Sequence, residues 1–177
     1  MKSVIKIIFF AFIIPFSVNA QVKLEKKTFL DNKIELMVPA DFKPMTEEML
    51  NTKYANTRQK PALILTDEDG EVNIIINHLP QPITPEQVSA FKDFQMSSLK
   101  KIRPDAKWLT DGVKTINGKN VGYFTFISNA IDQTVFNYYF FTDMDGKVLL
   151  LSFNCTGKLL PKWKEAAETI VSSLKVK

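Results

Sequence analysis

The sequence predicts an α+β protein, an α/β/α sandwich with a mainly antiparallel sheet of about seven strands and helices on both faces. Short turn sequences such as Asn117-Gly118 and Asp145-Gly146 separate neighbouring extended segments. Hairpins of this kind make a sheet antiparallel. Several of the strands are apolar on both sides, so both faces of the sheet need cover. Three segments with helical periodicity can supply it.

Residues 1–20 have the three-part pattern of a secretory signal peptide. Lys2 and Lys6 give a basic start, 4–16 is almost wholly apolar, and Val18 and Ala20 supply small residues before a cleavage point. The apolar run is shorter than the roughly 20 residues that span a bilayer. We therefore expect a signal peptide over 1–20 and a single domain over 21–177. The alternative is an uncleaved N-terminal anchor.

Composition places the rest of the chain among globular proteins. Hydrophobic residues make up 45% and charged residues 24% of the sequence. One Cys and one His exclude an intrachain disulfide framework and a Cys-rich zinc module. Lys2 and Lys6 account for two of the four net positive charges, so the predicted mature chain carries +2. That charge is too small for a nucleic-acid surface.

The first half of the mature chain predicts a hairpin, a helix and a second hairpin. Residues 28–38 form the first hairpin around a turn at 31–33, since apolar and polar residues alternate after it. Thr46 is a suitable N-cap for a short helix. Strands at 62–66 and 72–77 flank an acidic turn at 67–70.

Two longer helices are expected. The first begins at Thr84, with Pro85 at the first helical position and Gln87 completing a capping box. The last runs from about Pro161 to Leu174. At helical periodicity, the apolar face of the first helix is formed by Val88, Phe91, Phe94, Leu99 and Ile102. The buried stripe of the last helix is formed by Leu159, Trp163, Ala166, Ile170 and Leu174.

Four further strands lie between the first long helix and the last. They span 108–116, 120–128, 134–142 and 147–154, and are rich in β-branched and aromatic residues. Two of their connections contain Asn-Gly or Asp-Gly, and the third is a turn at 129–133. We expect their aromatic side chains to form the core.

Several short strings occur in order along these elements. They are Val38-Pro39-Ala40-Asp41-Phe42, Ile116-Asn117-Gly118, Tyr138-Tyr139-Phe140, Asp145-Gly146-Lys147, Leu151-Ser152-Phe153 and 170–176. With these strings and this order of elements, the chain resembles the PsbP-like fold group, which includes the PsbP extrinsic subunit of photosystem II and many bacterial exported proteins. The resemblance covers most of the chain from about Thr28 onward. It implies the fold and a tendency toward non-enzymatic binding or assembly, and it carries no catalytic residues.

Reactive residues are scarce. Cys155 follows a strand of large apolar residues, and we expect it to be a half-buried structural residue. His78 is expected at a strand end on the surface, because zinc needs at least three protein ligands. The acidic turns at 67–71 and 143–146 could offer oxygens to Ca²⁺, but hairpin geometry accounts for their Asp and Gly. We assign no catalytic, cofactor or metal residues.

These observations predict an exported, soluble, non-enzymatic protein, periplasmic or secreted, that is not an integral membrane protein. It would bind or assemble through a surface on an unknown protein partner in the cell envelope. The expected contact is the stiff loop 77–84, with Leu79, Pro80, Gln81, Pro82 and Ile83. The alternative is a carrier of a small molecule or ion with a pocket between helix and sheet.

Overall fold

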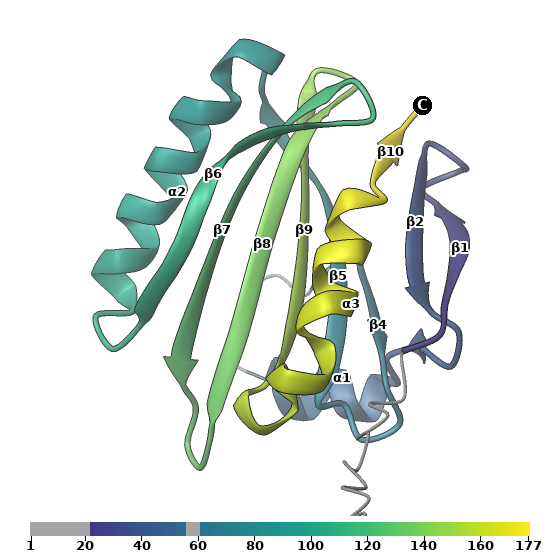
Figure 1. Cartoon of the computed structure of the whole chain (residues 1–177), viewed down its shortest axis with the longest axis vertical. Coiled ribbons are helices and arrows are strands. Elements are labelled where there is room, and N and C mark those ends of the chain that lie inside the picture. Colours follow the sequence, from purple (N-terminus) through teal and green to yellow (C-terminus); the bar gives the residue numbers. More distant parts are fainter. Residues whose placement is uncertain (1–21, 56–60) are drawn as a thin grey trace, which may run out of the picture.

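A computed structural model describes residues 22–55 and 61–177, and it contains the predicted antiparallel sheet (Figure 1). The sheet has seven strands in the order β3-β4-β5-β9-β8-β7-β6, and every neighbouring pair is antiparallel. The predicted signal peptide over 1–20 lies outside the described residues. The strands are β3 (Lys43–Pro44), β4 (Leu63–Thr66), β5 (Val72–Pro82), β6 (Lys107–Ile116), β7 (Lys119–Asn129), β8 (Thr134–Met144) and β9 (Lys147–Thr156).

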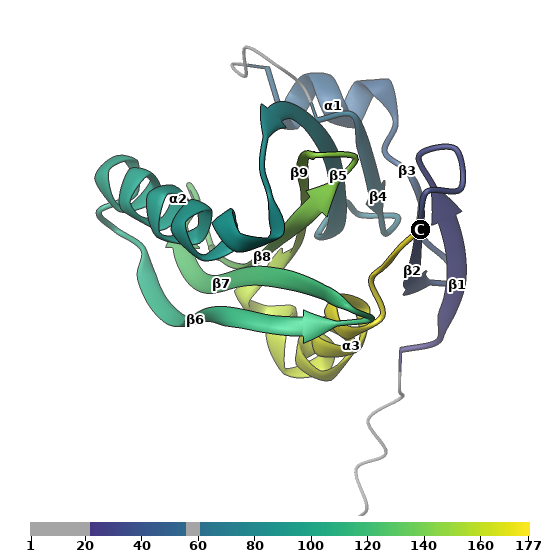
Figure 2. The ribbon, with the colours of Figure 1, turned by 90° about the horizontal axis from the view of Figure 1, so that it is seen from above.

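The two long helices cover opposite faces of this sheet, as predicted (Figure 2). Helix α2 (Val88–Ile102) follows a 3-10 turn (Pro85–Gln87), and Phe91 of α2 packs edge-on against Phe141 of β8. Helix α3 (Leu160–Ser172) follows a second 3-10 turn (Gly157–Leu159), and its Trp163 packs against Phe153 of β9. The fold is therefore the α/β/α sandwich that the sequence predicts.

A second, smaller sheet was not predicted. The expected N-terminal hairpin forms β1 (Leu24–Phe29) and β2 (Ile34–Pro39), and the C-terminal strand β10 (Lys175–Val176) pairs with β2. Side chains of β2 belong to the same buried cluster as α3. The C-terminus thus closes a three-stranded sheet beside the main one.

The short helix α1 (Glu47–Lys53) begins where Thr46 predicts it. The Thr46 hydroxyl accepts a hydrogen bond from the Met49 N–H at 3.3 Å. The C-terminal end of α1 approaches the β4–β5 turn, where the Lys53 ammonium donates a hydrogen bond to the Gly70 carbonyl. None of the helices in the described residues is both long enough and apolar enough to cross a membrane.

The buried face of α2 differs from the prediction. Phe94 and Ile102 are 60% and 70% exposed, although both were expected to be buried. Lys92 is buried instead, because its ammonium pairs with Asp111 of β6 and with Asp93. This pairing, together with the contact of Phe91 with Phe141, turns α2 so that Phe94 points to solvent.

Candidate functional site

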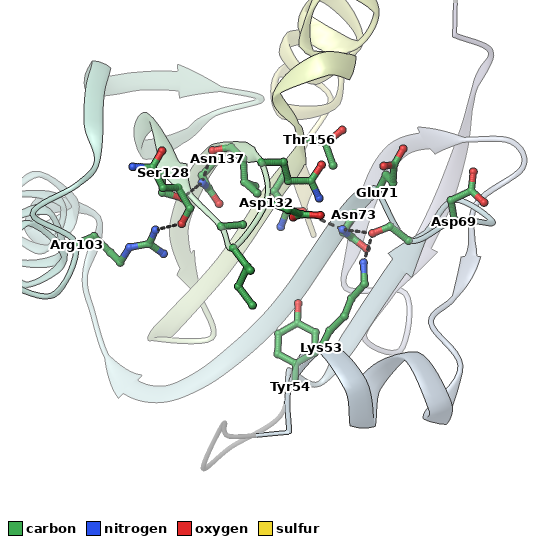
Figure 3. A pocket seen from close by; sticks show the side chains of 17 residues that line it. Lys53, Tyr54, Asp69, Glu71, Asn73, Arg103, Ser128, Asp132, Asn137 and Thr156 are labelled. Carbon is green, nitrogen blue, oxygen red and sulfur yellow. Dashed lines mark hydrogen bonds between the residues drawn. The ribbon is translucent and has the colours of Figure 1, made fainter.

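A polar cleft occupies the end of the sheet face that α2 leaves uncovered (Figure 3). Beneath α2 this face is apolar, with Phe124, Phe141 and Val148 buried against the helix. Toward the β7–β8 turn the same face becomes polar, and α1 lies across from it. The cleft has a volume of about 780 Å³ and is lined by Lys53, Tyr54, Asp69, Gly70, Glu71, Asn73, Arg103, Ser128, Asn129, Ala130, Ile131, Asp132, Gln133, Val135, Asn137, Asn154 and Thr156.

The floor of the cleft is a row of amide side chains from three adjacent strands. Asn73 of β5 stands opposite Asn154 of β9, and Asn154 stands opposite Asn137 of β8. Asn73 Nδ2 donates to Asn154 Oδ1 at 2.9 Å. Asn137 Nδ2 donates to Ser128 Oγ on β7 at 3.2 Å, which extends the row to a fourth strand. We call Asn73, Asn154, Asn137 and Ser128 the amide row.

Backbone carbonyls fix the orientation of two of these amides. Asn73 Nδ2 also donates to the Gly70 carbonyl at 3.2 Å, and Asn137 Nδ2 donates to the Val135 carbonyl at 3.1 Å. A carbonyl can only accept, so neither amide can exchange its nitrogen and oxygen. In the described part of the chain, Asn137 Oδ1 and Asn154 Nδ2 consequently remain as one acceptor and one donor without a partner.

Two polar atoms in the cleft are buried without a hydrogen bond to any described residue. They are Asn73 Oδ1 and Thr156 Oγ1, whose residues are 7% and 5% exposed. An unsatisfied buried polar group costs about 1–3 kcal/mol, and native structures contain few of them. Both atoms belong to residues that line the same cleft as the amide row.

One end of the cleft is fixed by Arg103, the C-cap residue that follows α2. Its guanidinium donates to both oxygens of Asp105, at 3.0 and 2.9 Å, and to the Asn129 carbonyl at 2.7 Å. The hydrogen bonds from Arg103 and from the Asn129 N–H hold the pKa of Asp105 well below its usual range. Arg103 therefore joins the end of α2 to the end of β7.

The opposite side is formed by α1 and the β4–β5 turn. Tyr54 ends α1 and is half-buried, and burial raises the pKa of its phenol. Figure 3 shows Tyr54 beside Lys53, whose ammonium shares the Gly70 carbonyl with the amide of Asn73. Glu71 forms an ion pair with Lys158 at 2.6 Å, so its carboxylate is already engaged.

The arrangement can hydrogen-bond a polar ligand through neutral groups. Amide and hydroxyl groups form the floor, while several charged residues at the rim are occupied by Asp105, Lys158 or backbone carbonyls. Within residues 22–55 and 61–177, no three His, Cys, Asp or Glu side chains gather in a way that could hold a metal ion. The cleft therefore has the character of a binding site for an uncharged polar molecule.

The structure does not contain the contact loop that the sequence predicts over 77–84. Residues 77–82 continue β5 as a strand, with a bulge between His78 and Pro82, and Pro82 stands opposite Lys147 of β9. Ile83 is buried and its N–H donates to the Gly146 carbonyl at 3.0 Å, so it cannot contact a partner. Leu79 is half-buried, which leaves Pro80, Gln81 and Pro82 exposed. The prediction of a loop was wrong because β9 extends far enough to pair with these residues.

Cys155 and His78 lie outside the cleft lining. Cys155 is fully buried rather than half-buried, and burial raises the pKa of its thiol to about 12. His78 is half-buried on β5, with Nε2 3.2 Å from the Met144 carbonyl. The structure does not bring these two residues to a common site.

The acidic turns have the hairpin geometry that was predicted. Asp67 Oδ1 accepts from the Val72 N–H at 3.1 Å, and Gly70 has a φ of +71°. Asp145 and Gly146 also have positive φ, and Asp145 pairs with Lys33 at 2.6 Å. Turn geometry therefore accounts for these Asp and Gly residues.

The amide row was missed by the sequence analysis. Asn73, Asn137 and Asn154 each interrupt an apolar strand, and Asn is depleted in strands. Such interruptions could have indicated a polar patch. The pattern alone could not show that the three residues are neighbours, because that depends on the order β5-β9-β8 in the sheet.

Comparisons with known proteins support the fold. No family model and no curated protein matches the chain. Among solved structures, the cyanobacterial PsbP (CyanoP) of Synechocystis has a TM-score of 0.59 at 12% identity, over 88% of this chain and 94% of that one. LpqN of Mycobacterium tuberculosis has a TM-score of 0.54 at 17% identity, over 88% and 91% of the two chains. A Pseudomonas aeruginosa protein of unknown function has a TM-score of 0.52 at 11% identity, over 87% and 97%. The chain has a PsbP-like fold.

Proposed function

We propose that this is an exported, non-enzymatic binding protein of the cell envelope, and that it holds a polar ligand in the cleft. The observation that carries this proposal is the amide row, which places unpartnered hydrogen-bonding atoms on a sheet face that is apolar beneath α2. Ligand sites are concave and contain a few convergent polar groups, and the cleft has both properties. This corresponds to the pocket between helix and sheet that the sequence left open as the alternative.

The states of the reactive residues support binding rather than catalysis. The Cys155 thiol is buried and its pKa is raised, whereas a nucleophilic thiol needs a lowered pKa and access to substrate. His78 is outside the cleft lining and contacts a backbone carbonyl. A general base within reach of a ligand in the cleft would have to be Asp69, Asp132 or Glu71, and Glu71 is paired.

Two observations support an envelope location. Residues 1–20 have the signal-peptide pattern, and LpqN is described as involved in cell envelope biogenesis. Intact-mass measurement of the protein from the cells that make it should show a chain beginning at Gln21. A full-length mass in the membrane fraction would instead indicate the uncleaved anchor.

Native mass spectrometry tests the cleft even while the ligand is unidentified. The protein is purified under non-denaturing conditions from the envelope fraction of its own cells. We expect an adduct on the wild type that is lost in Asn154→Leu, which removes both polar atoms of that amide. Asn120→Leu is the matched control, since Asn120 is exposed on β7 outside the cleft. An adduct that survives Asn154→Leu, or none on the wild type, contradicts the proposal.

A second candidate function is the predicted partner surface. The exposed side chains of Phe94 and Ile102 on α2 favour it, because large apolar groups at the surface commonly contact other proteins. Pro80, Gln81 and Pro82 remain the exposed part of the contact that the sequence predicts. Affinity capture from the envelope fraction should lose its partner with Phe94→Ser or Pro80→Ser if this function is the correct one. Asn154→Leu should leave that capture unchanged.

A further inference from the structure

The charges around the cleft oppose an anionic ligand. Its lining contains two basic residues and three acidic ones. Arg103 is held by Asp105 and the Asn129 carbonyl, and Lys53 donates to the Gly70 carbonyl. An anion would therefore have to compete with existing partners, and it would approach the carboxylates of Asp69 and Asp132 in the lining.

The floor instead presents neutral donors and acceptors in alternation. Asn154 Nδ2 is a free donor and Asn137 Oδ1 is a free acceptor, and these two residues are directly opposite on adjacent strands. Directly opposed residues have side chains about 4.5–5.5 Å apart at Cβ. A hydroxyl group both donates and accepts, so two neighbouring hydroxyls on a ligand can satisfy this donor and this acceptor together.

A hydroxyl continues the same pattern. Ser128 Oγ accepts from Asn137 Nδ2, which leaves its own O–H to donate. The row thus offers successive hydrogen-bonding positions across β9, β8 and β7 rather than a single point of attachment.

Tyr54 supplies an aromatic surface in the lining of the cleft (Figure 3). An aromatic ring can contact the C–H groups of a ligand while its hydroxyl remains available for a hydrogen bond. A cavity of 780 Å³ lies within the range of about 300–1,000 Å³ that small-molecule sites occupy. The cleft therefore combines an apolar contact on one side with neutral hydrogen-bonding groups on the other.

We propose that the cleft binds a neutral carbohydrate, with vicinal hydroxyls on the amide row and a sugar face against Tyr54. This inference rests on the proposed function, because it specifies the chemical class of the ligand in the same cleft. A sugar ring carries adjacent hydroxyls on its edges and C–H groups on its faces. It matches both sides of the cleft and brings no charge to the rim.

Binding of defined sugars tests the ligand class. The purified mature protein is screened on an array of neutral mono- and oligosaccharides and on phosphorylated, sulfated and carboxylated counterparts, and calorimetry gives the Kd of the best ligand. We expect neutral sugars to bind and the matched acidic sugars to bind at least about tenfold more weakly. If oligosaccharides bind more strongly than their single units, the natural ligand is a glycan chain. If the two bind equally, the natural ligand is a free sugar.

Variants connect that binding to the cleft. Asn154→Leu and Tyr54→Ala should each weaken the Kd by about tenfold or more, since each removes one side of the recognition. Tyr54→Phe should weaken it less than Tyr54→Ala, because the ring remains. Asn120→Leu should leave it unchanged. Circular dichroism and thermal unfolding of each variant show whether it is folded, so a loss of binding is read only in folded protein.

Asn154→Asp distinguishes a hydroxyl ligand from an anion. The carboxylate keeps the oxygen that accepts from Asn73, and a sugar hydroxyl can reverse its hydrogen bond and donate to the new oxygen. Neutral-sugar binding should therefore fall less in Asn154→Asp than in Asn154→Leu. Preferential binding of acidic sugars to the wild type, or loss of neutral-sugar binding equally in both variants, overturns the carbohydrate assignment.

The two proposals can fail separately. An adduct in native mass spectrometry that depends on Asn154, with no neutral sugar bound on the array, refutes the carbohydrate and keeps the cleft as a binding site. The absence of both results refutes both. Sugar binding that is insensitive to Asn154→Leu and Tyr54→Ala places the carbohydrate elsewhere on the molecule and also overturns the inference.

Discussion

A buried or half-buried amide whose nitrogen donates to a backbone carbonyl is held in one orientation. Asn73 and Asn137 are in this state, through the carbonyls of Gly70 and Val135. Their oxygens therefore point where the fold directs them, and Asn154 bridges between their strands. Preorganised polar atoms lose little conformational entropy on binding, which is the property a ligand site requires.

The environment of Cys155, by contrast, suppresses the reactivity of its thiol. Burial raises the pKa of the thiol from 9.0 to about 12. The folded state keeps the proton that the unfolded state loses, so this contribution to stability is present below pH 9 and is lost as the pH rises toward 12. We predict that the free energy of unfolding decreases over this window.

A variant isolates the contribution of the thiol. Tyr54, Tyr138 and Tyr139 also have pKa values raised by burial, so their phenols add to the loss of stability at high pH. Chemical unfolding of Cys155→Val should show a smaller decrease between pH 9 and 12 than the wild type shows. An identical decrease in both proteins would mean that the thiol does not titrate differently on unfolding.

At the scale of elements, the strands were predictable because their turn sequences and their β-branched and aromatic residues are local features. The orientation of α2 was not predictable in this way. Phe91 and Phe94 are equally apolar, and the periodicity admitted both to one face. Phe141 and Asp111 lie on other strands, and their contacts with Phe91 and Lys92 decide which side of α2 is buried.

This orientation predicts unequal effects of two matched substitutions. Phe91→Ala should destabilise the protein by about 3–5 kcal/mol, because it removes a buried ring and leaves a cavity. Phe94→Ala should change the free energy of unfolding by about 0.5 kcal/mol or less, since the ring is 60% exposed. Denaturant unfolding measures both. Equal costs would show that α2 is rotated relative to this description.

The sequence analysis missed the extension of β5 and the amide row for the same physical reason. Pro80 and Pro82 indicate a loop when read locally, but β9 provides a pairing partner across a bulge. The three Asn residues likewise gain their meaning from strands that are distant in sequence. Local propensity predicts an element, whereas the site depends on pairings between β5, β8 and β9.

At the scale of the whole molecule, the small sheet joins the β1–β2 hairpin to the C-terminal strand β10. Strand β10 pairs with β2, and the Lys177 N–H donates to the Lys33 carbonyl at 2.8 Å. Because β2 and α3 share one buried cluster, β10 fastens this sheet to the helix that precedes it. The cleft lies on the opposite face of the main sheet, so closure of the small sheet supports the fold without entering the site.

Removal of 175–177 tests this arrangement. We predict that the truncation destabilises the protein by about 1–2 kcal/mol, through loss of the strand pairing and its backbone hydrogen bond. Lys177→Ala removes only the ion pair with Glu35 and should cost less than the truncation, because exposed ion pairs contribute little to stability. Thermal unfolding should therefore shift by a few degrees for the truncation and by less for the control. A truncation without effect would contradict a stabilising role of β10.

The central claim is that the amide row forms a binding site, and nuclear magnetic resonance observes it directly. The side-chain amides of Asn73, Asn137 and Asn154 give their own signals in a ¹H–¹⁵N correlation spectrum of the mature protein. On addition of a low-molecular-mass extract of the envelope fraction, we predict that these three signals and the backbone signals of Ser128 and Thr156 shift together and saturably. Shifts confined to Phe94 and Ile102, to Gln81, or to no residues would contradict the account.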